Sequence, residues 1–239
     1  MTPAHFVSFF RAEADAFARV LETGDLDAPV PACPDWNLTA LTAHLGGIHR
    51  WARGAIVTGP GPIEEPDLPS DRDAIVAWFR EGADALHETL AAADPQTPCW
   101  SFGTDRSVAF WLRRQAHETS VHRWDAEASQ GAPGPIDPAL AVDGVHEVAD
   151  MFFPRQVSLG RIPPLTRTLR LTPDEGAPVV FAGDGTASVP PAEADAEVAG
   201  PAEALLLLVW GRTVLDDPRL RLGGSRAAAE EVLAQALAP

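Results

Sequence analysis

The stretch Trp111–Glu127, WLRRQAHETSVHRWDAE, places four side chains that can bind a metal ion or move a proton within nine residues: His117, Glu118, His122 and Asp125. Glu118 and His122 are four residues apart, so an α-helix puts them one above the other on the same face. A carboxylate and an imidazole at this spacing can bind one metal ion. The sequence therefore predicts one long helix here that supplies part of a metal site.

The chain around this stretch predicts two domains, a helical one over residues 1–153 and a smaller one over residues 154–239. Before residue 154, apolar residues recur at helical period between capping residues and Pro- or Gly-rich loops. We expect helices at about residues 3–22, 38–56, 71–93, 108–130 and 138–153, with caps at Thr2, Asp35 or Asn37, Ser70, Asp105 or Ser107, and Asp137. The first domain is therefore expected to be mostly a four-helix bundle.

After Pro154 the composition changes to short alternating or apolar runs separated by Gly and Asp, which are strand and hairpin signals. We expect strands at about residues 168–172, 178–182 and 194–198, and two closing helices at about 201–210 and 225–237. These elements make a small α+β domain. The whole chain is therefore expected to belong to the α+β class, with the helical bundle first.

The chain is strongly acidic. Its formal net charge is -16, with 18 basic residues against 34 acidic ones. Such a charge repels a phosphate backbone and an anionic membrane surface, so we expect neither nucleic acid nor membrane as a partner. All the basic residues are arginines, and Arg113, Arg114 and Arg123 are expected on a solvated face of the long helix.

The sequence lacks the patterns typical of a membrane span, a signal peptide and a cysteine-based zinc site. No apolar run approaches the length of a membrane span, and Met1–His5 lacks the basic and then apolar pattern of a signal peptide. We therefore expect a cytoplasmic protein, either a monomer or a homodimer. Cys33 and Cys99 lie far apart and neither has a CxxC partner. We expect both to be thiols and do not expect a cysteine-based zinc site.

His44 is the natural third ligand for Glu118 and His122. Metal sites in helical bundles are built from side chains on facing helices, and His44 interrupts the apolar face of the helix expected at residues 38–56. Two imidazoles and one carboxylate leave a coordination position open, which is typical of a catalytic site. Zinc is the first expectation, although Fe, Mn, Co or Ni could use the same ligands. His49 is five residues further along, so it cannot line the same face equally, and its participation stays open.

Simpler interpretations exist for each of these residues. A histidine on an apolar face, such as His44, is more often an ordinary core residue, and Glu118 with His122 can be an ordinary helical pair. His117 is five residues from His122 and is expected to point away from the site. Asp125 either accepts a hydrogen bond from a ligand imidazole or is exposed.

Two segments resemble signatures of the mycothiol-dependent maleylpyruvate isomerase family, part of the DinB-like superfamily of four-helix metal proteins. Cys33–Leu45, CPDWNLTALTAHL, is similar to the family pattern P-x-W-(x)7-H-L. His117–Ala126, HETSVHRWDA, is similar to H-E-x-x-x-H-x-x-D-A. Phe153–Arg155 through Leu205–Arg212 resembles the C-terminal domain of the family, so the resemblance covers nearly the whole chain. It carries the metal triad of the family onto His44, Glu118 and His122.

The resemblance implies a zinc-dependent enzyme that uses the low-molecular-weight thiol mycothiol as its cofactor. The metal would bind the thiol as a thiolate and so provide a nucleophile at neutral pH. In an isomerase of this type the thiolate adds to a carbon–carbon double bond, and rotation and loss of the thiol give the trans isomer. In related transferases the thiolate attacks a small electrophile and stays attached. No residue that binds mycothiol itself is identified.

The resemblance also implies that an arginine of the C-terminal domain takes part in catalysis. Arg212, which ends the segment LLLLVWGR, is the best match and could pair with a substrate carboxylate. The alternative is an arginine that binds the last carbonyls of a helix. Two other functions stay open, a hydrolase whose metal activates water and a non-catalytic bundle that binds a small molecule.

Overall fold

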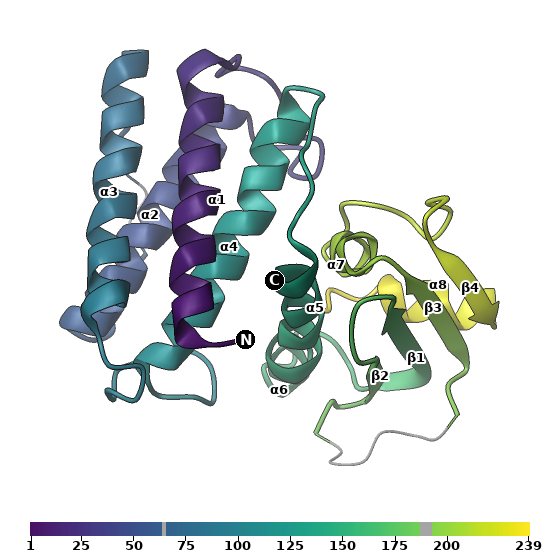
Figure 1. Ribbon diagram of the computed structural model, residues 1–239. Coiled ribbons are helices and arrows are strands. Elements are labelled where there is room, and N and C mark those ends of the chain that lie inside the picture. The colour runs from purple at the N-terminus through teal and green to yellow at the C-terminus, as the bar shows by residue number, and fades with distance from the viewer. Residues whose placement is uncertain (64–65, 187–192) are drawn as a thin grey trace. The chain divides into compact units, whose positions relative to one another are not determined.

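The computed structural model describes residues 1–63, 66–186 and 193–239, which form two compact units, Met1–Pro135 and Ile136–Pro239. The first unit is helical and the second mixes helices with a sheet, which confirms the predicted α+β class and the order of its parts (Figure 1). The division lies earlier than the boundary at 153/154 expected from the sequence. The helix α5 (Pro138–Glu147) packs against α7 (Ala202–Val209), so it belongs to the second unit.

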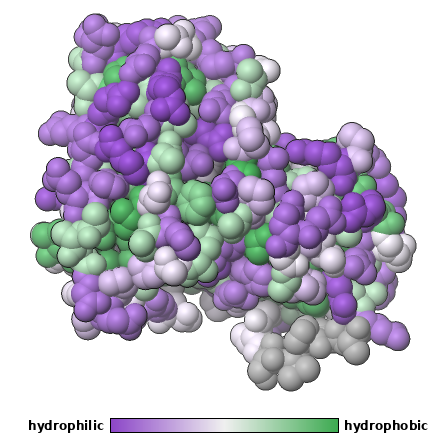
Figure 2. Space-filling model, in the orientation of Figure 1, coloured by the Kyte–Doolittle hydropathy of each residue, from purple (hydrophilic) through white to green (hydrophobic). Residues whose placement is uncertain are grey.

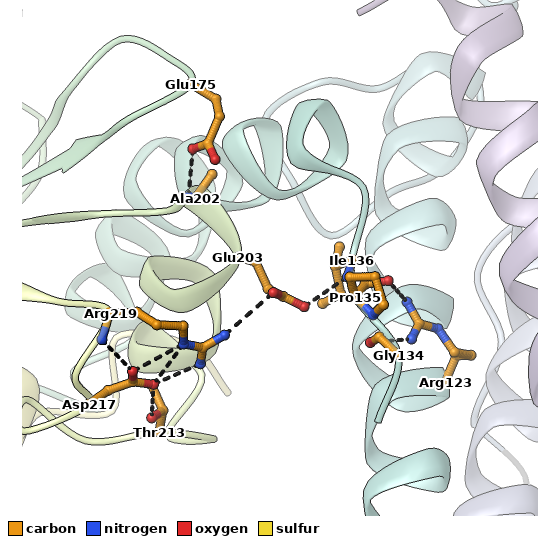
Figure 3. A network of polar contacts seen from close by, with 10 residues as sticks. All are labelled: Arg123, Gly134, Pro135, Ile136, Glu175, Ala202, Glu203, Thr213, Asp217 and Arg219. Atoms are coloured by element: carbon orange, nitrogen blue, oxygen red, sulfur yellow. Dashed lines mark hydrogen bonds and ion pairs between the residues drawn. The ribbon is translucent and has the colours of Figure 1, made fainter. Parts of the chain in front are cut away.

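The polar contacts on either side of this division explain its place (Figure 3). In the first unit, the guanidinium of Arg123 donates to the carbonyl oxygens of Gly134 and Pro135. In the second unit, the backbone N–H of Ile136 donates to Oε1 of Glu203 on α7, at 2.8 Å. The residues just before the division are therefore hydrogen-bonded to a buried side chain of the first unit, and the residue just after it to a half-buried side chain of the second unit.

Four helices of the N-terminal unit lie side by side as a bundle (Figure 1). They are α1 (Pro3–Thr23), α2 (Leu38–Val57), α3 (Arg72–Ala92) and α4 (Val108–Ser129). α1 packs on α3 and α4, and α2 packs on the same two helices. The core between them is apolar and includes Phe17, Leu41, Leu45 and Phe79. The predicted four-helix bundle is therefore confirmed.

The helix starts follow from local capping, with one correction. Of the two expected caps of α2, Asp35 and Asn37, the structure shows Asn37, whose side chain accepts a hydrogen bond from a first-turn amide. Ser70 was expected to cap α3, but the cap is Asp71, whose carboxylate accepts from the amide three residues further on. Ser107 precedes α4, and its hydroxyl bonds to Asp105 rather than to the helix.

The helix α4 buries polar residues as well as apolar ones. Its buried polar side chains are Arg114, Gln115, His117, Thr119, Ser120, His122, Arg123 and Asp125. The expectation that Arg114 and Arg123 lie on a solvated face is therefore wrong. Arg123 shows why, since it donates to Glu13 at 2.6 Å and to Glu127 at 2.8 Å. Buried charges require such partners, so carboxylates elsewhere in the unit make this burial tolerable.

The helix that was expected to end near Phe153 continues beyond Pro154. A π-helical turn, Val148–Phe152, follows α5 and leads into α6 (Phe153–Ser158). A proline inside an α-helix removes a hydrogen bond and collides with the preceding turn. The wider π turn ends just before Pro154, which then stands in the first turn of α6, where a missing N–H is harmless.

The second unit contains a sheet of four strands among the residues described. They are β1 (Leu165–Pro173), β2 (Val179–Gly183), β3 (Ala196–Gly200) and β4 (Arg221–Gly224), in the order β2-β1-β3-β4. β1 pairs antiparallel with β2 and parallel with β3, while β3 and β4 are antiparallel. Leu169 and Leu171 of β1 are fully buried, as the alternating pattern predicts.

The strand β4 was not predicted. Its sequence, RLGG, offers one apolar side chain and two glycines, so it carries no alternation. It becomes a strand because β3 provides a partner for its backbone. The predicted closing helices are confirmed as α7 and α8 (Arg226–Leu233), with Ser225 as the N-cap of α8.

The surface is mostly polar on the face that Figure 2 shows. The large apolar side chains that are exposed come from separate places along the chain: Met1, Val57, Ile63, Leu159 and Val214. Among the helices of the described ranges, none combines the length and the apolar character that crossing a membrane requires.

Candidate metal centre

Two helices of the bundle bring His44, Glu118 and His122 together. His44 lies on α2, seven residues after the cap Asn37, and the other two lie on α4. The Nε2 atom of His44 is 3.3 Å from Oε1 of Glu118, and Nε2 of His122 is 3.4 Å from the same oxygen. One potential ligand atom from each residue lies within 4.8 Å of the others. The structure thus groups the three residues that the sequence proposed, and their role as ligands stays a prediction.

The spacing of these atoms matches that of zinc ligands. Ligand atoms about 2.0–2.1 Å from a tetrahedral zinc ion lie about 3.3 Å from one another. The observed distances of 3.3 and 3.4 Å from Glu118 to the two imidazoles are of this size. Without a metal, the same contacts act as long hydrogen bonds between the imidazoles and the carboxylate. The donor set and its two distances to Glu118 therefore fit a divalent metal ion, with all three ligand atoms within 4.8 Å of one another.

The cluster is partly accessible to solvent. The side chain of His44 is 31% exposed and that of Glu118 is 16% exposed, whereas His122 is nearly buried. The ring of Trp36, which lies just before the cap of α2, has its centroid 4.7 Å from that of His44. His44 is therefore the most exposed residue of the cluster, and an indole ring lies beside it.

Asp125 supports His122 from behind. Its carboxylate is fully buried, and Oδ2 lies 3.0 Å from Nδ1 of His122. A carboxylate in this place orients the ring and favours the proton on Nδ1, which leaves Nε2 to face a metal. The sequence left two alternatives for Asp125, and the structure shows the contact with the imidazole rather than an exposed side chain.

Arg114 is the residue of the cluster that the sequence did not identify. Its Nη2 atom donates to Oε2 of Glu118 at 2.9 Å, and its side chain is buried. The spacing of four residues from Arg114 to Glu118 is the same as from Glu118 to His122. This spacing signals a contact between Arg114 and Glu118, although the run of charged residues favours a solvated face.

Charges within the cluster reinforce one another. Burial alone would raise the pKa of Glu118, but the hydrogen bonds with His122 and His44 hold that pKa well below its usual range, and the charge of Arg114 acts in the same direction. Burial also lowers the pKa of His122, yet its hydrogen bonds with Asp125 and Glu118 outweigh this and raise the pKa to about 9. Glu118 is therefore ionised, as a carboxylate ligand must be, whereas the imidazole of His122 has to give up a proton when it binds a metal.

Two other buried histidines, one on α2 and one on α4, do not join the cluster. His49 is fully buried, and its Nε2 atom is 3.0 Å from Oγ1 of Thr119. Its ring packs edge-on against Phe10, and burial lowers its pKa to about 3, so it is a neutral core residue. His117 is buried against Phe6 of α1.

Arg212 belongs to the C-terminal unit and follows α7. Its Nη1 atom donates to the carbonyl oxygen of Trp210 at 2.7 Å, and its backbone N–H donates to that of Leu207. This is the arrangement of an arginine that binds the last carbonyls of a helix, which was the alternative interpretation. A catalytic role for Arg212 stays a prediction.

Both units match domains of one known protein family. Residues 9–127 match the mycothiol maleylpyruvate isomerase N-terminal domain, and residues 139–231 match the C-terminal domain of the same family. Over 137 residues the chain is 28% identical to two uncharacterized proteins of Mycobacterium tuberculosis, Rv0738 of strain H37Rv and MT0763 of strain CDC 1551. The aligned part is 54% of this chain and 69% of each relative.

Solved structures show the same fold. The crystal structure of the mycothiol-dependent maleylpyruvate isomerase matches with a TM-score of 0.64 and 13% identity, and covers 93% of both chains. That of a single-residue mutant of the enzyme matches with the same TM-score and coverage at 12% identity. At this identity the likeness is one of fold, and the two domain matches carry the assignment. The chain belongs to the mycothiol-dependent maleylpyruvate isomerase family.

Proposed function

We propose that the protein is a metal-dependent enzyme that uses mycothiol as a thiolate nucleophile on a small electrophile. It acts as an isomerase of the maleylpyruvate type or as a thiol transferase. The observation that carries this proposal is the convergence of two imidazole nitrogens on one oxygen of Glu118, at the spacing of zinc ligands. Membership of the family supports mycothiol as the thiol.

The residues of the cluster have separate tasks in this proposal. His44, Glu118 and His122 would hold zinc or another divalent ion, and Asp125 would keep Nε2 of His122 directed at it. When bound, the metal supplies a positive charge that keeps a thiol deprotonated at neutral pH. Two imidazoles and one carboxylate are the protein ligands of sites that leave a position for such a molecule.

The thiol function is favoured over water activation. A hydrolase needs a carboxylate or another base near the metal to accept a proton from water. The two carboxylates of the described cluster are Glu118, which is bound to Arg114, and Asp125, which is bound to His122. Both carboxylates already accept hydrogen bonds from these partners. A thiol that binds the metal can lose its proton to solvent and needs no such base.

The substrate in this proposal is a small electrophile, with a carboxylate that Arg212 would pair. A guanidinium can donate two parallel hydrogen bonds to a carboxylate. In the structure Arg212 donates to the carbonyl oxygen of Trp210, so binding a substrate would require this contact to be shared or exchanged.

Metal content and thiol binding test the proposal together. Purified protein should contain about one metal ion per chain, and His44→Ala or His122→Ala should lose it. His87→Ala is the matched control, because it removes a half-buried histidine of α3 that lies outside the cluster. Mycothiol added to the cobalt-loaded protein should produce a thiolate-to-metal absorption band. Full metal content in both ligand variants, or no band with mycothiol, would contradict the proposal.

A further inference from the structure

The two carboxylate oxygens of Glu118 have different partners. Oε1 faces Nε2 of His44 and Nε2 of His122, at 3.3 and 3.4 Å. Oε2 accepts a hydrogen bond from Nη2 of Arg114, at 2.9 Å. The carboxylate therefore offers one oxygen to the place where the imidazoles converge, while the other oxygen is directed toward a guanidinium.

Arg114 is well placed to keep this arrangement. Its side chain is 3% exposed, so its contact with Glu118 is shielded from water and from screening by salt. The two residues are one helical turn apart on α4, where the backbone is rigid and the side chains are neighbours. Turning Oε2 toward the imidazoles would leave a buried guanidinium without this partner, which is costly.

This matters for the number of free positions on a bound metal. A carboxylate that binds a metal through both oxygens takes two coordination positions, and one that binds through a single oxygen takes one. With two imidazoles already present, the second mode leaves more room for an incoming ligand. The positive charge of Arg114 cancels the negative charge of Asp125. A divalent ion bound to the carboxylate of Glu118 therefore leaves one net positive charge on these groups, which suits a monoanionic ligand.

We propose that Arg114 is a positioning residue that restricts Glu118 to one metal-binding oxygen and so keeps a coordination position open for a thiolate. This inference rests on the proposed function, because it concerns the same site. Arg114 acts through Glu118 and does not itself touch the metal or the thiol. Its loss should therefore change how the metal is coordinated and how a thiolate binds, and not only how stable the bundle is.

Cobalt spectroscopy of variants tests this. In cobalt-loaded Arg114→Gln, Glu118 is free to bind through both oxygens, so the d–d absorption should weaken as the coordination number rises. The affinity for 2-mercaptoethanol, measured from the thiolate-to-metal band, should fall about tenfold or more. Arg114→Lys keeps the charge and an N–H donor and should restore part of the affinity.

Arg113→Gln is the matched control, because it removes the same charge from the neighbouring position of α4. It should leave the spectrum and the thiol affinity close to those of the wild type. An equal loss in Arg113→Gln would show that total charge is responsible and would overturn the proposal. Wild-type spectrum and affinity in a folded, cobalt-loaded Arg114→Gln protein would overturn it as well.

A measurement on the wild-type protein covers the case in which Arg114→Gln does not fold. X-ray absorption of the zinc-loaded wild type should show one carboxylate oxygen in the coordination shell, and two oxygens from one carboxylate would overturn the proposal. A wild-type protein that takes up neither cobalt nor zinc would refute the proposed function itself. Normal metal uptake with unchanged behaviour of Arg114→Gln would refute only the role of Arg114.

Discussion

Nδ1 of His122 lies 3.0 Å from Oδ2 of Asp125, a carboxylate that is completely buried. The two residues are three positions apart on α4, so the contact is made within one helix and does not depend on loops. It sets the orientation of the imidazole before any ligand arrives. The metal site proposed here is therefore preorganised on one of its two helices.

Replacing Asp125 tests this preorganisation. Asp125→Ala should lower the affinity for zinc about 10- to 100-fold, because the ring of His122 loses the partner that orients it. A competition titration with a chromogenic chelator measures the change. Asp150→Ala, which removes an exposed carboxylate of the C-terminal unit, should leave the affinity unchanged. Equal affinities for wild type and Asp125→Ala would mean that the contact does not support metal binding.

Metal binding should also stabilise the N-terminal unit. A ligand that binds only the folded state at a concentration of 100 times its Kd adds about 2.7 kcal/mol to the free energy of unfolding. Urea unfolding of chelator-treated protein, with and without added zinc, measures this difference. In His44→Ala the added zinc should have little effect. A midpoint that does not move in the wild type would contradict the metal site.

Arg123 should be important for stability. It is buried and holds Glu13, Glu127 and two backbone carbonyls, so Arg123→Met leaves buried acceptors without a donor. The expected loss is about 3–5 kcal/mol in the free energy of unfolding. Combining it with Glu13→Gln should recover part of that loss. Arg19→Ala, at an exposed position, should change stability by less than about 0.5 kcal/mol.

His49 should make the protein less stable in mild acid. Burial lowers its pKa to about 3 in the folded state, against 6.5 for a free histidine. Between these two pKa values His49 is protonated in the unfolded chain and neutral in the folded chain. Its contribution to the free energy of unfolding is therefore fully present above pH 6.5 and is lost as the pH falls toward 3. At pH 5 the loss is about 2 kcal/mol.

A substitution isolates this contribution from that of the carboxylates. His49→Gln can keep a hydrogen bond with Thr119 but has no titrating ring. The unfolding free energies of both proteins are measured between pH 4 and pH 8. As the pH falls, the wild type should lose more stability than the variant, because only the wild type has the titrating ring. Parallel curves would show that His49 does not titrate differently in the folded and unfolded states.

Arg212 has a kinetic test. If it pairs a substrate carboxylate, Arg212→Ala should raise KM for an anionic substrate by about tenfold or more, the loss of a charged hydrogen bond. The metal content should stay the same. Steady-state kinetics with mycothiol present measures KM, and elemental analysis provides the control. An unchanged KM would remove Arg212 from the proposed substrate site.

Much of the fold could be predicted from the sequence because the signals are local. The caps Thr2, Asn37 and Asp137 and the apolar period between them place the helices within a few residues. The strands β1, β2 and β3 have side-chain patterns that match their burial. The sequence did not predict β4, which depends on pairing with a neighbouring strand. It also placed the end of the helix near Phe153, whereas a π turn lets the helix continue past Pro154.

The candidate site, too, could be predicted only in part from the sequence. Glu118 and His122 share a helix face by their spacing, and His44 stands out as a histidine on an apolar face, so the sequence alone selected these three. Only the tertiary structure showed that Arg114 and Asp125 are buried and which atoms they hold. Burial of a charged side chain depends on the carboxylates and imidazoles that other turns and other helices bring to it. Residue spacing indicates which side chains share a face of α4, but their burial exists only once α1 and α2 pack against that helix.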